Sequence, residues 1–110
     1  MDTTESMQRA LMPLAVLSVL EASPAHGYAL VAALREVGFA NAQGGTVYPM
    51  LRAMEGDGLV LSEWDVTGTG PARKVFRLTE SGAGRVARDR IAVQHALESI
   101  DHLRNGRTSA

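Results

Sequence analysis

The segment from Gly44 to Val60 constrains this 110-residue chain more than any other part of it. Its apolar residues recur at spacings of three and four, which predicts a short helix with one buried face. The members of this apolar stripe are Val47, Met50, Leu51 and Met54. After Gly58 the residues alternate in the manner of a strand. We therefore expect a helix that leads directly into a strand.

Three side chains of this helix lie off the apolar stripe, namely Thr46, Tyr48 and Arg52. A hydroxyl, a hydrogen-bonding aromatic ring and a guanidinium on a helix that leads into a hairpin are suited to contacting DNA. The alternative is an ordinary amphipathic helix whose outer face is only solvated.

The other segments follow the order of elements of a winged helix-turn-helix. Two helices are expected upstream, joined by a turn over residues 22–25, and Pro13 either starts or kinks the first one. A glycine-rich tip over residues 67–71 joins two strands, and Thr79 is a suitable N-cap for a last, long helix. The upstream helices are expected over residues 7–21 and 26–37, and the strands over 59–66 and 73–78. The predicted fold class is mainly α with a two-stranded β-hairpin, followed by a long C-terminal helix.

The formal net charge of −1 hides an uneven distribution. Residues 1–65 carry three arginines against eight acidic residues, a local balance of −5. Residues 66–90 carry six basic against two acidic residues, a local balance of +4. DNA binding requires a locally basic surface, because phosphates are neutralised locally. The distribution permits DNA binding without requiring it.

Composition argues against several other classes of protein. The absence of cysteine excludes disulfides and thiolate chemistry. The acidic start of the chain is unlike a signal peptide, and the apolar run over residues 11–20 has half the length of a membrane span. Three scattered histidines, with no paired carboxylates beside a nucleophile, do not form an enzyme site. We expect a cytoplasmic, non-enzymatic protein without a cofactor or a membrane partner.

The last helix carries apolar residues at near-heptad spacing that a winged helix does not need for its own core, so we interpret them as a dimer surface. The expected interface consists of Val86, Val93, Leu97, Ile100 and Leu103, with Leu11 from the first helix. Ile91 flanks this surface, and Arg90 and Arg104 interrupt it. The predicted organisation is a DNA-binding domain over residues 1–79, a dimerisation helix over 80–105 and a frayed tail over 106–110. Residues 1–12 are expected to form an arm that also takes part in the dimer contact.

Three motifs in this order resemble the PadR family of bacterial transcriptional regulators, in particular its short members with one C-terminal dimerisation helix. The motifs are His26-Gly27-Tyr28-Ala29-Leu30, then Gly45-Thr46-Val47-Tyr48-Pro49-Met50-Leu51-Arg52, then Arg73-Lys74-Val75-Phe76-Arg77-Leu78-Thr79-Glu80-Ser81-Gly82. Val47 replaces the usual leucine and Phe76 a common tyrosine, and both are tolerable core exchanges. The resemblance implies a sequence-specific, homodimeric repressor that binds an inverted repeat in double-stranded DNA.

Six residues are predicted to contact DNA: Thr46, Tyr48, Arg52, Arg73, Lys74 and Arg9. Thr46 is equally suited to capping its helix, and the Tyr48 ring has the alternative of packing against Pro49 and the wing. Adjacent residues of a strand point to opposite sides, so we expect only one of Arg73 and Lys74 to contact DNA directly.

Other residues near these motifs have structural interpretations. Arg52 has the alternative of pairing with Glu55 or Glu36 on the protein surface. Gly27 is expected to allow a close approach of helices, and Tyr28 to pack. Trp64, the only tryptophan, is expected to pack between the wing and a helix.

An effector site is the least determined feature. The family resemblance implies a pore between paired C-terminal helices that holds flat apolar ligands, and the candidate lining is Met7, Leu11, Val93, Leu97 and Ile100. The last helix has no aromatic residue to stack on such a ligand, which argues against a planar inducer. Its polar face, formed by His95, Glu98, Asp101 and His102, is interpreted as solvated, and no metal is predicted.

Two other functions compete with an inducible repressor. One is a winged helix used only for protein–protein binding, which would not need Arg52, Tyr48 and a basic wing together. The other is a DNA-binding protein without an inducer.

Overall fold

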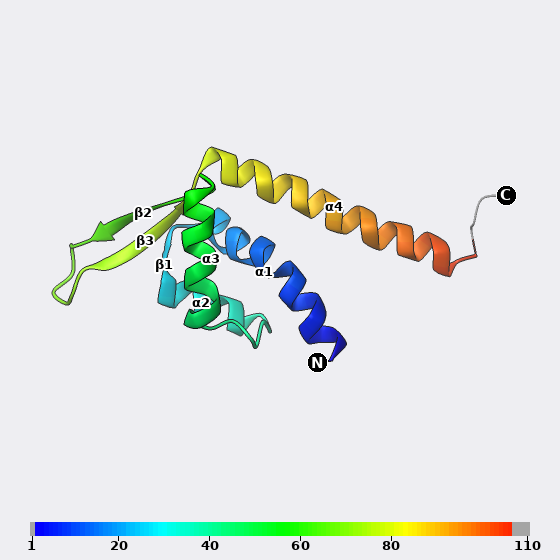
Figure 1. The fold of residues 1–110 in the computed structure, drawn as a ribbon, viewed down its shortest axis with the longest axis horizontal. Helices are drawn as coiled ribbons and strands as arrows, with labels where there is room; N and C mark the ends of the chain where they lie inside the picture. Colours follow the sequence, from blue (N-terminus) through cyan, green and yellow to red (C-terminus); the bar gives the residue numbers. More distant parts are fainter. Residues whose placement is uncertain (1, 107–110) are drawn as a thin grey trace.

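The computed structural model describes residues 2–106. Figure 1 shows the N-terminal helices gathered beside a small sheet, with the C-terminal helix projecting away from them. The predicted frayed tail lies outside the described residues except for Gly106. The elements in chain order are α1 (Thr3–Ala22), β1 (Ala25–His26), α2 (Gly27–Glu36), α3 (Gly44–Gly56), β2 (Val60–Asp65), β3 (Arg73–Leu78) and α4 (Glu80–Arg104).

Helix α1 is longer than the sequence pattern predicted. Asp2 caps it, since the Asp2 carboxylate accepts a hydrogen bond from the Glu5 backbone N–H at 2.8 Å. The helix continues through Pro13, so the proline does not start it. Its buried residues are Met12, Val16, Leu17 and Leu20.

The sheet has three antiparallel strands in the order β1-β3-β2. β2 and β3 form the predicted hairpin, with Val60 opposite Leu78 and Asp65 opposite Arg73. Ala25 was predicted to belong to a turn and His26 to start a helix, but the two residues form β1 and pair with Phe76 and Val75. The fold class is confirmed, and this short third strand is an addition to it.

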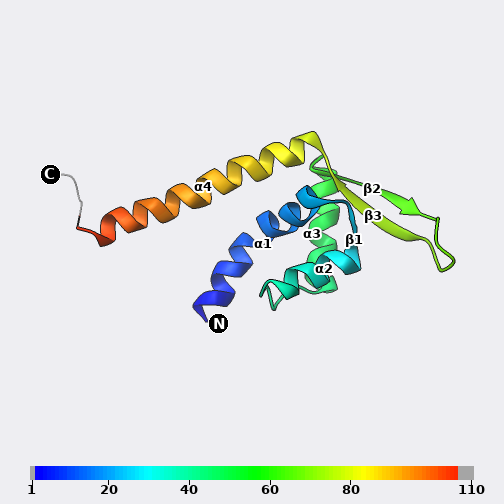
Figure 2. The same cartoon turned by 180° about the vertical axis from the view of Figure 1, so that it is seen from behind.

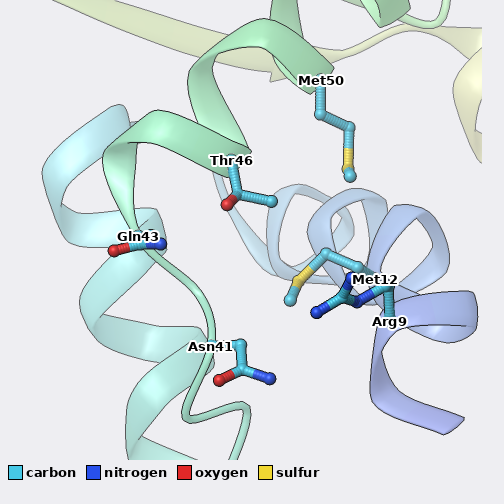
Figure 3. A pocket seen from close by; sticks show the side chains of 6 residues that line it. All are labelled: Arg9, Met12, Asn41, Gln43, Thr46 and Met50. Carbon is cyan, nitrogen blue, oxygen red and sulfur yellow. The ribbon is translucent and has the colours of Figure 1, made fainter. Parts of the chain in front are cut away.

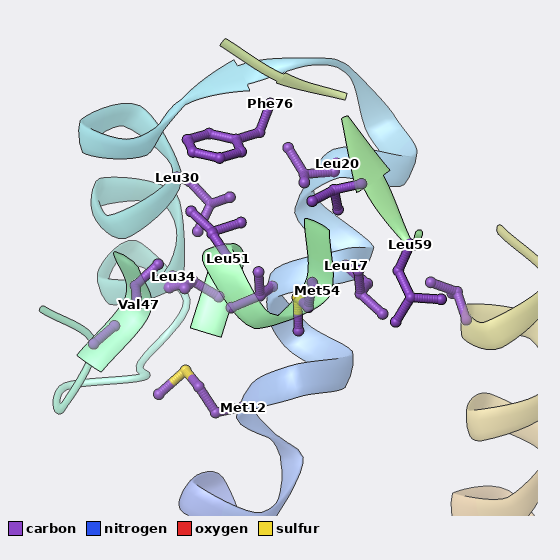
Figure 4. Packing of buried hydrophobic residues seen from close by; sticks show 14 residues of the cluster. Met12, Leu17, Leu20, Leu30, Leu34, Val47, Leu51, Met54, Leu59 and Phe76 are labelled. Carbon is purple, nitrogen blue, oxygen red and sulfur yellow. The ribbon is translucent and has the colours of Figure 1, made fainter. Parts of the chain in front are cut away.

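A single apolar core joins the three helices, the sheet and the start of α4, and Figure 4 shows its side chains. The α3 stripe is confirmed, because Val47, Leu51 and Met54 are buried and Met50 is half-buried. Phe76 of β3 is also buried. Val47 and Phe76, which replace a leucine and a tyrosine of the family motifs, are therefore core residues, as predicted.

The first two turns of α4 belong to this core. Thr79 caps the helix, since its hydroxyl oxygen accepts from the Gly82 N–H at 2.9 Å, as predicted. The same hydroxyl donates to the Gly58 carbonyl at 2.7 Å. Gly82 and Val86 are buried. Val86 is fully enclosed within its own protomer, so it must be removed from the expected dimer interface.

The remainder of α4 leaves the core. Every residue from Ile91 to Gly106 is exposed, and Figure 2 shows this part of the helix extending beyond the other elements. No helix in residues 2–106 is both long and apolar enough to cross a lipid bilayer.

We predict that Gly82→Ala lowers the free energy of unfolding by about 1–3 kcal/mol, because the new methyl group would collide with the Leu59 carbonyl oxygen and backbone cannot easily yield. Gly84→Ala, two residues later in α4, is the matched control. There the nearest atom is the flexible Arg88 Nη1 at 3.2 Å, so alanine should raise stability by up to about 1 kcal/mol. Urea denaturation at one protomer concentration measures both, and equal effects would contradict this packing.

Candidate nucleic-acid interface

The outward side of α3 carries a cation and no free carboxylate. Arg52 is exposed, and within residues 2–106 it forms no ion pair. Glu55, its expected alternative partner, is turned toward β2 and accepts a hydrogen bond from the Ser62 hydroxyl at 2.6 Å. The surface pairing considered for Arg52 is therefore not observed.

Tyr48 is held in place by Gly27 at the start of α2. A Cβ atom on Gly27 would overlap the Tyr48 ring and would lie 2.6 Å from its hydroxyl oxygen. Gly27 thus permits a close approach, as predicted, between α2 and the Tyr48 ring. The ring remains 39% exposed, so its position is fixed while part of it is accessible. Two of the three family motifs meet at this contact.

Thr46 lies in the first turn of α3 and is exposed. The N-cap residue of α3 is Gln43, whose carbonyl oxygen accepts from the Thr46 backbone N–H at 3.0 Å. In the part of the chain that the structure describes, the Thr46 hydroxyl has no hydrogen-bond partner. This hydroxyl does not cap the helix, and it is free to donate to a ligand.

The two wing residues that were predicted to contact DNA, Arg73 and Lys74, lie on opposite faces of the hairpin. Lys74 is opposite Trp64 across the hairpin, and its ammonium group lies 5.8 Å from the centre of the indole ring. Arg73 is opposite Asp65 and points to the other face, as strand alternation predicted. The predicted packing of Trp64 against a helix is wrong, since the side chain is 64% exposed and contacts Lys74 instead.

The acidic groups of the wing are engaged with other partners. Glu63 pairs with Arg77 at 3.2 Å. The pKa of Asp65 is lowered because its carboxylate accepts hydrogen bonds from the Thr67 hydroxyl and backbone N–H and lies 3.3 Å from His26 Nε2. Neither carboxylate forms an ion pair with Arg73 among the residues described.

The His26–Asp65 contact was missed by sequence reasoning. It joins β1 to the end of β2 and so connects the start of α2 with the wing. Its only sequence signal was the first residue of the His26-Gly27-Tyr28 motif. Tyr28, which was predicted to pack, is 81% exposed because it faces away from the core.

Arg9 and Thr46, which are 37 positions apart in the sequence, line one cavity of about 320 Å³. Figure 3 shows this cavity between α1, the segment before α3 and the first turns of α3. Its lining consists of Arg9, Met12, Asn41, Gln43, Thr46 and Met50. Asn41 and Gln43 were not among the predicted site residues, because nothing in their spacing marks them.

A second hollow, of about 440 Å³, is an apolar groove between α1, α2 and α4. Of the five residues proposed for an effector pocket, Leu11 and Val93 line this groove, whereas Met7, Leu97 and Ile100 do not. Leu97 and Ile100 lie farther along α4 and are exposed. Over residues 2–106 no group of three or more histidine, aspartate or glutamate side chains is arranged to hold a metal.

Comparisons with known proteins agree with this geometry. Residues 16–88 match the Transcriptional regulator PadR-like family. The chain is 34% identical over 93 residues to Transcriptional regulator Rv3488 of Mycobacterium tuberculosis, and the match covers 84% of this chain and 85% of that protein.

Solved structures of PadR proteins have the same fold. A PadR family transcriptional regulator from Eggerthella lenta is 33% identical, with a TM-score of 0.77 over 89% of this chain and 81% of the other. Bacillus subtilis PadR, crystallised in complex with operator DNA, is 24% identical, with a TM-score of 0.64 over 71% of this chain and 45% of that longer one. The second likeness shows the fold alone.

These matches confirm the resemblance carried by the three motifs, and they are to regulators rather than to enzymes. The chain belongs to the PadR-like family of transcriptional regulators.

Proposed function

We propose that this protein is a homodimeric repressor that binds an inverted-repeat operator through α3 and the wing. The observation that carries the proposal is the outward side of α3, where Arg52 has no acidic partner among the described residues and the only glutamate of the helix is bound to Ser62. A helix face with a free guanidinium and exposed hydroxyls is complementary to base edges and phosphates in the major groove.

The wing and α1 extend this surface. Arg73 and Lys74 stand near a glycine-rich tip, and such a tip can approach the backbone or the minor groove where a helix cannot enter. Arg9 of α1 and Thr46 of α3 line the same cavity, and both are suited to a backbone phosphate beside the groove. The Bacillus subtilis PadR crystallised with operator DNA supports DNA as the ligand of this fold.

The projecting part of α4 supports a dimer. Gly82 and Val86 are buried in the core, and Val93, Leu97 and Ile100 continue the same side of the helix as an exposed α4 stripe. Burial of this stripe against a second copy would stabilise the dimer by about 1.5–3 kcal/mol for each side chain that becomes fully buried. The apolar groove, which Leu11 and Val93 line, is continuous with the stripe at Val93. We assign the stripe of a second copy as the occupant of this surface, with Leu103 at its end.

A dimer of this kind would explain recognition and release. Two α3 helices placed about 34–36 Å apart would enter successive major grooves of an inverted repeat. A bound dimer would occlude RNA polymerase. An effector at the dimer interface would change the separation of the α3 helices, and a coupling free energy of about 1–3 kcal/mol is sufficient for induction.

The assignment of Arg52 predicts that Arg52→Ala weakens operator binding by at least about tenfold while the fold and the oligomeric state persist, because a base or phosphate contact is lost. Arg88→Ala, which removes an exposed arginine of α4, is the control for net charge and should retain most of the affinity. Fluorescence anisotropy on the operator measures both variants. Equal affinity of Arg52→Ala and the wild type would refute the assignment.

The α4 stripe predicts that Leu97→Asp converts the dimer to monomers and weakens DNA binding, because a carboxylate would have to be buried. Ile91→Asp is the matched control, since Ile91 is also an exposed apolar residue of α4 but lies off the stripe. Sedimentation velocity should report a dimer for this control. A stable dimer of Leu97→Asp would exclude the interface.

A further inference from the structure

The cavity lined by Arg9, here named the Arg9 cavity, has walls that are tied to each other. Gln8, the neighbour of Arg9, donates a hydrogen bond from its side chain to the Gly38 carbonyl at 2.7 Å, and so connects α1 to the segment before α3. Ala42 of that segment is buried in the core, and Met12 on the opposite wall is only 4% exposed. Contacts within one protomer therefore hold together the three elements that line the cavity.

The polar part of this cavity is cationic. Arg9 supplies a guanidinium, and across residues 2–106 no carboxylate lies within ion-pair distance of it. Glu5, one turn earlier in α1, forms no ion pair with it either. Asn41, Gln43 and Thr46 add neutral groups that can donate hydrogen bonds, and none of the six lining residues is acidic. Such a lining favours an anion with oxygen atoms, because guanidinium groups bind carboxylates and phosphates in a bidentate manner.

The apolar part consists of two thioethers. Figure 3 shows the sulfur atoms of Met12 and Met50 between α1 and α3, on the side where the Arg9 guanidinium lies. Methionine side chains are flexible and polarisable, so they adapt to an apolar ligand of variable shape. No aromatic ring belongs to this lining, so nothing in it selects a planar molecule.

We propose that the Arg9 cavity binds a small aliphatic monocarboxylate, with the carboxylate on Arg9 and its neighbouring amide and hydroxyl groups and the alkyl chain against Met12 and Met50. The site lies within one protomer, and it is distinct from the apolar groove beside α4.

A bound carboxylate would oppose DNA binding. This step rests on the proposed function, in which Arg9 and Thr46 contact a backbone phosphate. A carboxylate in the cavity occupies the same donors and neutralises the charge of Arg9, so phosphate and carboxylate compete for one site. The operator affinity of the dimer should therefore fall as the ligand concentration rises.

Isothermal titration calorimetry of the full chain with sodium hexanoate tests the site without DNA. Hexanoate should bind saturably, and hexanamide, the uncharged counterpart, should not. Arg9→Gln should weaken hexanoate binding by at least about tenfold, since a charged hydrogen-bonding group is lost. Arg9→Lys should be intermediate, because lysine keeps the charge without the planar fork. Arg88→Gln, an exposed arginine outside the cavity, should bind as the wild type does.

Methyl-labelled methionine locates the ligand by NMR. The Met12 and Met50 methyl signals should shift on addition of hexanoate, whereas the signal of the core residue Met54 should not; each of the three signals is assigned by its loss in the corresponding Met→Leu variant. The same spectra report whether each Arg9 variant is folded. Absence of hexanoate binding, equal binding by Arg9→Gln, or binding of inorganic phosphate alone would overturn the proposal.

Fluorescence anisotropy with the DNA upstream of the protein's own gene, used as the operator fragment, then tests the competition separately. Addition of hexanoate should lower the operator affinity of the wild type. It should have no effect on the operator affinity of Arg9→Gln, which lacks the guanidinium that binds the carboxylate. Hexanoate binding with no change in operator affinity would overturn the competition. A protein that binds hexanoate but no DNA would overturn the proposed function, and the calorimetric result on the site would stand.

Discussion

The junction between α3 and α4 determines the arrangement of the whole molecule. The Thr79 hydroxyl bridges the two helices, because it donates to the Gly58 carbonyl after α3 and accepts from the Gly82 N–H at the start of α4. Gly58 has a φ of +77°, a backbone conformation that glycine adopts readily. Gly82 lies against the Leu59 carbonyl with no room for a side chain. The direction of the proposed dimerisation helix is thereby fixed relative to the proposed DNA-reading helix.

This fixed junction gives the proposed repressor a simple mechanical basis. The first turns of α4 are part of the core, so a change in how two α4 helices pair would be transmitted to α3 without a flexible linker. A ligand at the Arg9 cavity would act differently, because it would remove phosphate contacts within one protomer. The two proposed routes to release would act on different contacts, one at the dimer interface and the other at the Arg9 cavity.

The sequence predicted the elements whose pattern is long or strongly periodic. The α3 stripe, the hairpin strand Arg73–Leu78 and the Thr79 cap were correct because local spacing and capping chemistry determine them. The strand β1 was missed because two residues are too few to show an alternation. Val86 was assigned to the dimer surface because heptad spacing does not distinguish a residue that packs on its own core from one that packs on a partner.

The exposure of the candidate residues of α3 was predictable from the sequence, but their contacts were not. Thr46, Tyr48 and Arg52 were identified from the face of α3 that the apolar stripe leaves outside. The contact of Tyr48 with Gly27, the pairing of Trp64 with Lys74 and the Arg9 cavity join residues distant in sequence, which no local pattern encodes. Exposed aromatic residues such as Tyr28 were misjudged because hydrophobic character alone favours burial.

The central claim, specific DNA binding by α3 and the wing, is tested most directly by a fluorescence anisotropy titration. The purified protein is titrated against the DNA upstream of its own gene and against a scrambled fragment of equal length, at two salt concentrations. We predict tight binding to the native fragment alone, with an affinity that falls about a hundredfold or more between roughly 50 and 200 mM salt, as phosphate contacts require. No binding to either fragment at low salt would contradict the claim and would favour a winged helix that binds another protein.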